Sequence, residues 1–228
     1  MKNIKNTVSI IIPTFNRAHF LKKVIDSAIN QTYECEVIVC NHGSTDDTDK
    51  VAKAYKDKIK YIKRDRDFGP HFCWLEGVTY SNGKFIHLQY DDDWIESTFI
   101  ERCMEIIDKD TGFCFASPKI YNVKENKYSS SDFHNWLPRT GKYLVKDFEK
   151  KLIKRLISPS AVVYRRSEVI DGLYQGNLPL SKNHYHGVGP DQFLTLLSML
   201  RYKKFGFVSE QLAIFSAHDD SISISASK

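Results

Sequence analysis

Apolar runs of strand length alternate with segments of helical periodicity along the first half of the chain. The runs are continuous and rich in β-branched residues, which is typical of parallel strands covered on both faces. The segments between them carry apolar residues three and four positions apart, which indicates helices with one buried face. This alternation predicts an α/β fold with a mostly parallel central sheet, right-handed crossovers and flanking helices. The predicted strands span residues 7–13, 35–41, 58–64 and 84–89, and the predicted helices span 19–31, 44–56, 70–80 and 97–110.

The ends of two of these elements carry further signals. Ser44 precedes a segment with acids in its first turn, so we expect Ser44 to be the N-cap of the second helix. The strand at 58–64 alternates polar and apolar residues, which predicts a position near the edge of the sheet.

The pattern changes after Pro118, where polar and aromatic residues follow and no internal repeat is present. We expect a single domain over residues 1–228. Its first half, 1–118, is of a nucleotide-binding type, and its second half, 119–228, supplies a different role. Later elements are predicted as a strand at 160–166, a helix at 191–204 and a strand pair at 205–208 and 212–218.

Composition agrees with a globular domain and limits its partners. With 228 residues and 42% hydrophobic content, the chain can bury one full core. Its 33 Lys and Arg residues against 28 Asp and Glu residues give a net charge of +5, which suits an anionic ligand or a membrane surface but does not indicate nucleic-acid binding. No apolar run approaches the roughly 20 residues of a membrane span, so we expect a soluble protein.

The cysteines give no sign of a disulfide framework. They are odd in number, lack C-x-x-C spacing and mostly lie within apolar runs. We interpret them as reduced core residues of a cytoplasmic protein. The five positions are Cys35, Cys40, Cys73, Cys103 and Cys114.

Polar and charged residues gather where the predicted strands end. In an open parallel sheet, ligands bind outside the carboxyl ends of the strands. Carboxylates hold a hard cation, and a cation together with arginine neutralises phosphate, so this edge predicts a phosphate ligand bridged by a divalent metal. No G-x-G-x-x-G follows the first strand, and the P-loop-like residues 77–84 are one residue too long and lead into a strand. The segments at the strand ends are 13–17, 41–44, 64–69 and 89–93.

Six blocks in order carry a resemblance to a known family. They are VSIIIPTFNR (8–17), CNHGSTDDT (40–48), YDDDW (90–94), SPSAVVYRR (158–166), GPDQFLTLLSML (189–200) and AHDDSIS (217–223). Together they resemble the family 2 glycosyltransferases, whose fold is the Rossmann-like GT-A fold. The resemblance implies a metal-dependent, inverting enzyme that moves a sugar from a nucleotide diphosphate sugar to an acceptor hydroxyl, with UDP favoured as the nucleotide.

On the donor side, the resemblance implies a divalent cation, Mn²⁺ or Mg²⁺. The family's D-x-D-D pattern begins here at Gln89, where the first acid is missing. Asp91 is then the implied metal ligand, and Asp92 a supporting carboxylate that orients ribose, metal waters or backbone. His218 matches a late histidine directed at the metal or the diphosphate, and neutral imidazole is a suitable Mn²⁺ ligand. Asp93 is expected to turn to solvent or to cap the next segment.

The implied nucleotide pocket departs from the family pattern at one position. His42 replaces an acid that typically accepts a hydrogen bond from the uracil N–H. A neutral imidazole can accept through one nitrogen whereas a protonated one cannot, which leaves thymidine and guanosine open beside uridine. The other implied donor-binding residues are Pro13, Thr14, Asn16, Arg17, Ser44, Arg66 and Gly69.

Asp191 matches the second acid of the family's E-D motif, just before a helix, and is the implied catalytic base. The alternative is that Asp191 only caps that helix. Pro190 stands where the first acid of the motif is usual.

The implied acceptor is a glycan or a lipid-linked glycan in bacterial surface-glycan biosynthesis, at the cytoplasmic face of the membrane. The basic stretch 146–155 fits either a solvated helix face or a peripheral membrane contact. Aromatic and histidine side chains of the second half could stack on a sugar ring or could be core and loop packing. They are Tyr121, Phe133, His134, Trp136, His184, Tyr185 and His186.

Two alternatives to an active transferase stay open. Gln89, His42 and Pro190 are compatible with a catalytically impaired relative that binds a nucleotide or a glycan. A nucleotide-sugar pyrophosphorylase would share the nucleotide-binding half, but it should carry a G-x-G-T-R-like loop where this chain has P-T-F-N-R.

Overall fold

The computed structural model describes residues 7–129, 137–155, 157–173 and 190–218. The strands are β1 (Val8–Thr14), β2 (Cys35–His42), β3 (Lys60–Arg64), β4 (Phe85–Leu88), β5 (Trp94–Ile95), β6 (Thr111–Asn122), β7 (Lys127–Ser129), β8 (Gly141–Leu144), β9 (Val162–Arg165) and β10 (Lys204–Ala217). The helices are α1 (Ala18–Ile29), α2 (Thr48–Lys53), α3 (Pro70–Tyr80), α4 (Phe99–Ile106), α5 (Val145–Lys154), α6 (Arg166–Gly172) and α7 (Pro190–Arg201), with short 3₁₀ helices η1 (Lys56–Lys58) and η2 (Pro159–Ala161).

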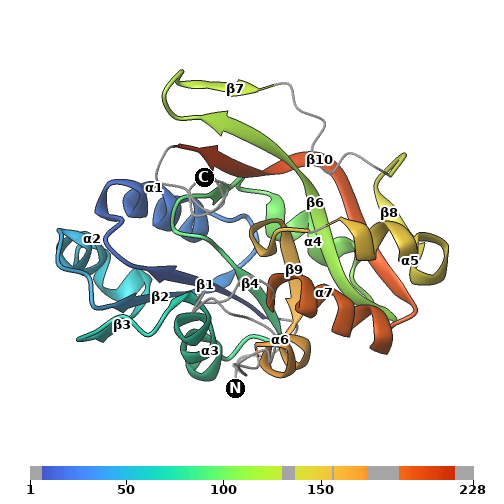
Figure 1. Cartoon of the computed structure of the whole chain (residues 1–228), viewed down its shortest axis with the longest axis horizontal. Coiled ribbons are helices and arrows are strands. Elements are labelled where there is room, and N and C mark those ends of the chain that lie inside the picture. Colours follow the sequence, from blue (N-terminus) through green and yellow to red (C-terminus); the bar gives the residue numbers. More distant parts are fainter. Residues whose placement is uncertain (1–6, 130–136, 156, 174–189, 219–228) are drawn as a thin grey trace, which may run out of the picture.

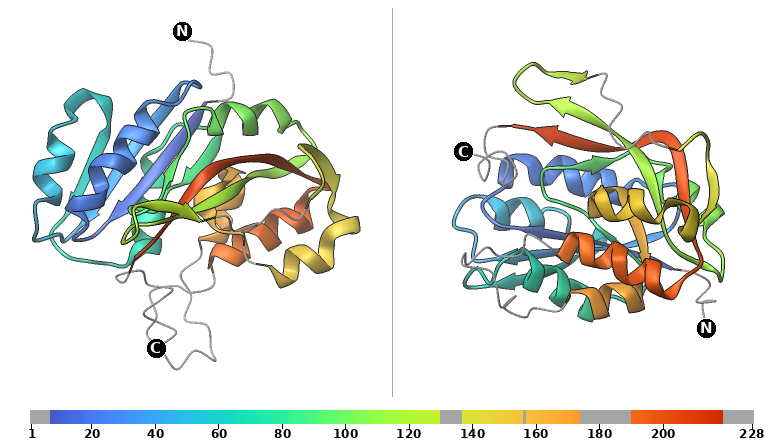
Figure 2. Two further views of the ribbon diagram at one scale, coloured as in Figure 1. Left: turned by 90° about the horizontal axis from the view of Figure 1, so that it is seen from above. Right: turned by 45° about the vertical axis from the view of Figure 1, so that its right-hand side comes forward.

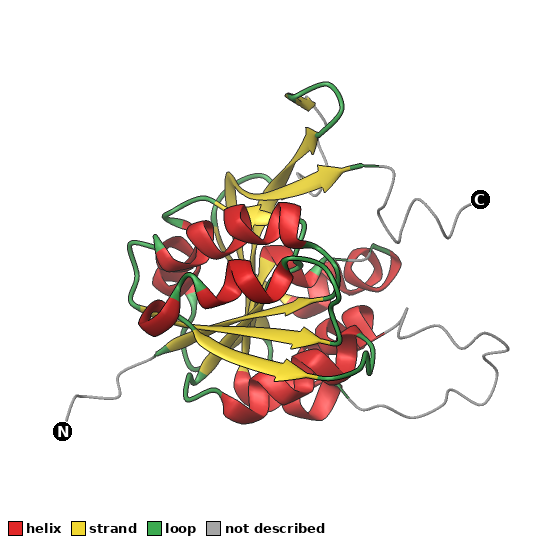
Figure 3. Ribbon diagram, turned by 90° about the vertical axis from the view of Figure 1, so that its left-hand side faces the viewer, coloured by secondary structure: helices red, strands yellow, loops and turns green. Residues whose placement is uncertain are grey.

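A mixed sheet forms the centre of the molecule, and helices cover both of its faces (Figures 1 and 3). Its main strand order is β3-β2-β1-β4-β9-β6-β10-β5, with β7 added to β6 and β8 added to β10. The strands β3, β2, β1 and β4 are all parallel to one another. Beyond β4 the pairing is mixed, because β9 runs antiparallel to both β4 and β6 whereas β10 runs parallel to β6. The predicted α/β architecture is confirmed, with the parallel strands concentrated in the first half.

Strand β1 explains the division of the core into two layers. Every residue of β1 is buried, and successive side chains point to opposite faces of the sheet. Ile10 and Ile12 pack with apolar residues of α1, α2 and α4, whereas Ile11 packs with those of α3, α5, α6 and α7. Figure 2 shows α5, α6 and α7 together on one side of the sheet. A continuous apolar run is what such a two-sided position requires.

Several sequence-based boundaries agree closely with the structure. The helix predicted at 70–80 is α3, and the strand predicted near an edge is β3, the first strand of the sheet order. The cysteines are free, and all except the partly buried Cys35 are buried, as predicted for core residues. No helix within the described part of the chain is long and apolar enough to cross a membrane.

The second half differs from the prediction in its strands. The long strand β6 was not predicted, and it runs across residue 118, where we had divided the chain. The predicted strand pair at 205–208 and 212–218 is wrong, because both segments belong to the single strand β10. Shifts in the β6–β10 register near Val208 and Gln211 mark where the apolar pattern is interrupted without ending the strand.

The predicted cap of the second helix is also wrong. Helix α2 begins at Thr48, with Asp47 at the N-cap position. Ser44 lies in the preceding loop, where its backbone N–H donates to Asn41 Oδ1 and its hydroxyl accepts from the backbone N–H of Asn16. Ser44 therefore links the ends of β1 and β2 by hydrogen bonds, and helix α2 starts about one turn later.

Candidate active site

The carboxyl ends of the parallel strands lie side by side, as the topology requires. Thr14 of β1 is in register with Asn41 of β2, and His42 is in register with Arg64 of β3. The segment that follows β4 reaches the same edge, because the backbone N–H of Phe15 donates to Asp91 Oδ2 at 3.4 Å. Residues predicted from four separate segments of the sequence are thus brought to one edge of the sheet.

Asn16 joins the loop after β1 to the loop after β2 by hydrogen bonds. Its backbone has a φ of 54°, a left-handed conformation that asparagine tolerates better than most residues. From this position its Oδ1 accepts from the backbone N–H groups of Thr45 and Asp46, at 2.8 and 3.3 Å. Arg17 follows at the N-cap position of α1. The turn at residues 13–17 therefore holds the loop after β2 in place, and it also presents its own side chains at the sheet edge.

The His42 cluster, which consists of His42, Arg64 and Glu76, balances its charges internally. His42 Nε2 lies 2.8 Å from Glu76 Oε2, and Arg64 Nε donates to Glu76 Oε1 at 2.7 Å. Burial disfavours the charged form of Glu76, but the hydrogen bonds from Arg64 and His42 outweigh burial and keep the pKa of Glu76 below its usual value. An ionised carboxylate only accepts, so Nε2 of His42 carries a proton. In neutral His42 the second nitrogen, Nδ1, is then an acceptor.

Two phenylalanines pack on His42, one from the loop after β3 and one from the first turn of α3. The rings of Phe68 and Phe72 lie 5.8 and 5.9 Å from the imidazole, and both phenylalanines are partly exposed. The Arg66 guanidinium lies 4.5 Å from the centre of the Phe68 ring. A planar ligand could stack on such a surface.

Two glycines allow this loop to approach the strand ends. Gly43 has a φ of 75°, and a Cβ placed on it would lie 2.7 Å from the backbone of Arg66 and Asp67. Gly69 has a φ of 84° and stands at the N-cap position of α3, where its N–H donates to Asp67 Oδ1. Side chains at these positions would be strained or would push the loop away from His42.

The acid segment, Asp91, Asp92 and Asp93, has an excess of negative charge. Burial raises the pKa of Asp91 to about 7, and the charge of Asp92 adds to this rise, while Arg17 opposes it. Burial and the charge of Asp92 also raise the pKa of Asp93 well above its usual range. The expectation that Asp93 turns to solvent is wrong, since it is 7% exposed and its Oδ1 accepts from the Ser216 backbone N–H.

His218 joins the acid segment from the end of β10. Its Nε2 lies 3.0 Å from Asp92 Oδ2, and its ring packs against Phe20 of α1. Nδ1 of His218 is buried and has no partner among the described residues. Carboxylates and an imidazole are suitable ligands for Mn²⁺, so the chemical types of these side chains are compatible with a divalent cation. Within the described ranges, no group of three or more histidine, cysteine, aspartate or glutamate side chains is arranged to hold a metal ion.

Gln89 does not face the edge where the acids gather. It is fully buried, and its Oε1 lies 2.8 Å from Nε2 of the equally buried His87. The missing first acid of the D-x-D-D pattern is thus replaced by a side chain that is engaged within the core.

Asp191 is held in place by side chains of two other elements. Its Oδ2 accepts from the Tyr90 hydroxyl at 2.9 Å, and its Oδ1 lies 3.7 Å from His71 Nε2. Trp74 contacts both of these residues, with ring centres 5.3 Å from each. The Asp191 side chain is 21% exposed, so the carboxylate can still be reached from outside. Burial, together with the nearby Asp191 charge, raises the pKa of Tyr90 well above its usual value, so Tyr90 remains a donor.

The structure adds Glu76 and His71, which sequence reasoning missed, and it gives partners to Arg64 and Tyr90, which lie in the predicted strand-end segments. Their roles depend on which face of α3 meets β2 and on the placement of α7, and no local sequence pattern specifies either. One signal was available, because Glu76 is an acid that lies among apolar residues of the predicted helix 70–80. A buried acid requires a partner.

The proposed acceptor side is only partly described. Tyr121 lies on β6, where its ring meets Trp94 and Tyr128. The other aromatic and histidine candidates, namely Phe133, His134, Trp136, His184, Tyr185 and His186, lie outside the described residues.

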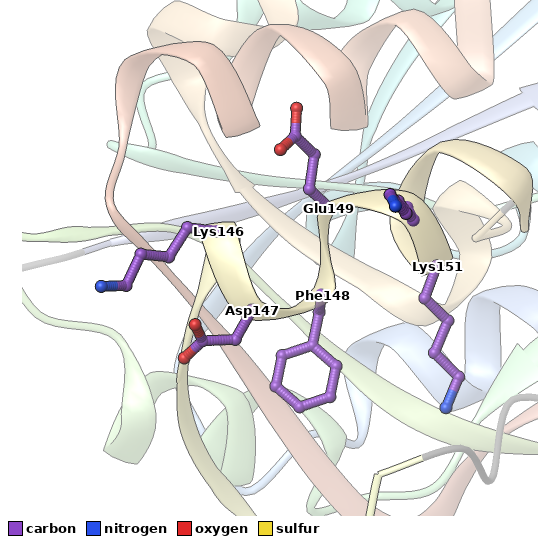
Figure 4. Close-up of a pocket in the computed structure, with 6 residues that line it drawn as sticks. Lys146, Asp147, Phe148, Glu149 and Lys151 are labelled. Carbon is purple, nitrogen blue, oxygen red and sulfur yellow. The ribbon is translucent and has the colours of Figure 1, made fainter.

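The basic stretch forms α5, away from the residues of the sheet edge. A hollow of about 380 Å³ lies along this helix and is lined by residues 146–151 (Figure 4). The side chains of Lys146 and Asp147 point to the outside of the helix in Figure 4. Because one helix supplies the whole lining and none of the predicted site residues contributes, the hollow adds nothing to the candidate site.

Comparison with protein families identifies the scaffold. Residues 9–171 match the family described as Glycosyl transferase family 2. The chain belongs to this family. An uncharacterized glycosyltransferase of Rickettsia prowazekii is 38% identical over 103 residues, which are 45% of this chain and 32% of that protein. Chondroitin synthase of Pasteurella multocida is 30% identical over 132 residues, which are 57% of this chain and 14% of that protein. The chain thus spans a third or less of the length of these two relatives.

Solved structures with a similar fold support the predicted architecture. S. aureus TarS 1-349 in complex with UDP-GlcNAc superposes with a TM-score of 0.73 at 20% identity, over 94% of this chain and 60% of that one. Mannosyltransferase PcManGT from Pyrobaculum calidifontis, in complex with GDP-Man and Mn²⁺, superposes with a TM-score of 0.61 at 13% identity, over 94% of this chain and 58% of that one. The predicted GT-A fold is confirmed.

Proposed function

We propose that this family 2 protein transfers a sugar from a nucleotide diphosphate sugar, UDP-linked, to an acceptor hydroxyl with inversion at the anomeric carbon. The observation that carries the proposal is the position of Asp91 and Asp191 at one edge of the sheet, joined through Tyr90. Inversion requires a base on the face opposite the departing diphosphate, and we assign this role to Asp191, whose side chain is 21% exposed. TarS with UDP-GlcNAc supports the choice of a UDP-linked donor.

A divalent cation, Mn²⁺ or Mg²⁺, is part of this proposal. Asp91 and His218 would hold it, with Asp92 in support and the remaining positions left to the diphosphate and water. When bound, the cation would neutralise charge on the leaving diphosphate. The same neutralisation would offset the charge excess of the acid segment. The complex of PcManGT with Mn²⁺ supports this part of the proposal by analogy.

The donor pocket in this proposal uses the strand ends and the loop after β3. Arg17 and Arg66 provide positive charge, while Pro13, Thr14, Asn16, Ser44 and Gly69 shape the backbone around them. We place the nucleobase beside the partly exposed rings of Phe68 and Phe72, which pack on His42, whose buried Nδ1 has no partner among the described residues. The acceptor would be a glycan or a lipid-linked glycan of a bacterial surface polymer. The likeness to chondroitin synthase favours a polysaccharide acceptor.

A catalytically impaired nucleotide-binding relative is the second candidate. Gln89 stands where the family pattern has its first acid, and it is buried, so this position supplies no carboxylate to the sheet edge. This observation favours the impaired relative. Membership in a glycosyltransferase family does not favour a pyrophosphorylase.

A donor-turnover assay separates the two candidates. A panel of nucleotide sugars is incubated with the protein, with and without Mn²⁺, and release of nucleoside diphosphate is measured. The transferase proposal predicts Mn²⁺-dependent release with one or a few donors. For the variant Asp191→Asn it predicts retained donor binding and a loss of transfer of about 100-fold or more, since the base is removed. Donor binding without turnover in the wild-type protein would instead support the impaired relative.

A further inference from the structure

Tyr90 connects the acid segment to Asp191 and is fixed at both of its ends. Its backbone N–H donates to Ser160 Oγ at 3.0 Å, in the 3₁₀ helix η2. Its hydroxyl donates to Asp191 Oδ2 at 2.9 Å, across 101 positions of sequence. Asp91 is the next residue in the chain. The segment Tyr90–Asp91 therefore carries one of the two carboxylates on which the proposed reaction depends, and it contacts the other, Asp191.

The ring of Tyr90 has little freedom to move away from Asp191. Trp74 of α3 packs on it, with ring centres 5.3 Å apart and planes inclined by 35°. Trp74 also contacts His71 edge-on, and His71 Nε2 stands 3.7 Å from Asp191 Oδ1. The phenol is thus backed by a buried indole, while the imidazole lies at the other oxygen of the same carboxylate.

We propose that Tyr90 is a positioning residue that orients the Asp191 carboxylate and sets its place relative to Asp91. The inference rests on the proposed function, in which Asp191 takes the acceptor proton. The Tyr90 hydroxyl occupies Oδ2, so the proton from the acceptor goes to Oδ1. As that proton moves, the acceptor oxygen forms a bond to the anomeric carbon, and the bond from that carbon to the diphosphate breaks with its electron pair on the diphosphate oxygen.

Adjacency in the chain is what makes Tyr90 suitable for this role. Consecutive Cα atoms are about 3.8 Å apart across a trans peptide, so Tyr90 and Asp91 cannot shift independently by much. A donor held at Asp91 and a base held by Tyr90 therefore keep a constant separation. Such constancy matters because a reacting geometry is lost when groups are displaced by about 1 Å.

The variant Tyr90→Phe tests the inference because it removes only the hydroxyl and keeps the ring against Trp74. We expect kcat for transfer to fall by about 10-fold or more, as hydrogen bonds to charged groups are the stronger ones. The donor KM should stay within about 2-fold of the wild-type value, because the interaction serves the chemical step.

Tyr164→Phe is the matched control. Tyr164 is also buried, and its hydroxyl bonds Thr195 Oγ1 at 3.0 Å on the same helix, α7, one turn beyond Asp191. This control loses a buried hydroxyl without touching the carboxylate. It should keep kcat within about 2-fold of the wild-type value.

The outcomes separate this inference from the proposed function. A wild-type kcat in Tyr90→Phe, combined with an inactive Asp191→Asn, would overturn the role of Tyr90 and leave the base in place. An active Asp191→Asn would instead overturn the proposed function. If Tyr90→Phe fails to fold, Trp74→Phe decides, because it loosens the packing on the Tyr90 ring and leaves both the Tyr90 hydroxyl and Asp191 unchanged. A lowered kcat with unchanged donor KM supports positioning, and a wild-type kcat refutes it.

Discussion

Two clusters of charge lie at the same edge of the sheet and differ in how their charges are balanced. In the His42 cluster, the Glu76 carboxylate meets both Arg64 and His42 within hydrogen-bond distance. In the acid segment, three consecutive carboxylates lie together, and burial, with the charge of Asp92 added, raises the pKa of Asp91 and of Asp93. In the His42 cluster, the negative charge of Glu76 is balanced by partners within the protein. In the acid segment, Asp91 meets the Phe15 N–H and Asp92 meets His218, but three carboxylates lie close together, which is why we propose the cation there.

The largest expected effect comes from neutralising the acid segment. Asp91→Asn should lower donor turnover by about 100-fold or more, since it removes the proposed metal ligand. Its thermal unfolding midpoint without metal should stay equal or rise, because one of several close negative charges is gone. Assays of nucleoside diphosphate release and thermal melts measure the two effects.

Asp57→Asn serves as its control, because Asp57 is an exposed acid in η1 and should leave both quantities unchanged. A marked loss of stability in Asp91→Asn would mean that Asp91 is bound within the protein, as Glu76 is, and the contrast between the clusters would fail.

Glu76→Gln tests the balanced cluster, with a smaller expected effect. The free energy of unfolding should fall by about 1–3 kcal/mol, because a buried carboxylate with two partners is replaced. Urea unfolding measures this change. Glu210→Gln is the matched control, since Glu210 also pairs with an arginine, Arg102, but its side chain is 42% exposed against 5% for Glu76.

The control should lose no more than about 1 kcal/mol. Equal losses for Glu76→Gln and Glu210→Gln would show that burial adds nothing to the His42 cluster.

Gly43→Ala concerns the loop that covers the His42 cluster. We expect a loss of about 1–2 kcal/mol in unfolding free energy, because alanine disfavours the left-handed backbone of Gly43. The displaced loop should also weaken donor binding, which isothermal titration with UDP measures. Gly141→Ala is the control, since a Cβ there meets nothing within 4 Å. An unchanged UDP affinity in Gly43→Ala would show that the loop over the His42 cluster is not part of the donor pocket.

The same contrast explains what the sequence could predict. The parallel strands and their helices were predictable because both faces of β1 and β2 are covered, which requires continuous apolar runs. The acid segment was recognisable because its residues are consecutive. The His42 cluster was not, because Glu76 lies 34 positions from His42 and the face of α3 that meets β2 is decided by packing. The contact of Tyr90 with Asp191, across 101 positions, depends on the placement of α7 in the same way.

The second half was harder for a further physical reason. Strand β6 changes from fully buried residues to partly exposed ones along its length, so it shows neither a continuous apolar run nor a clear alternation. Strand β10 continues through exposed polar residues near Glu210 because its neighbour β6 supplies hydrogen bonds on both sides of the irregularity. Pairing with a distant strand, which local pattern does not report, holds these segments extended.

The most direct test of the central claim is a crystal structure of the protein grown with UDP and Mn²⁺, with the metal located by its anomalous signal. Our assignment predicts a manganese peak in direct contact with the Asp91 carboxylate, the diphosphate beside it and the uracil beside the rings of Phe68 and Phe72. A structure with UDP bound elsewhere, or with UDP at this edge and no metal near Asp91, would contradict the assignment.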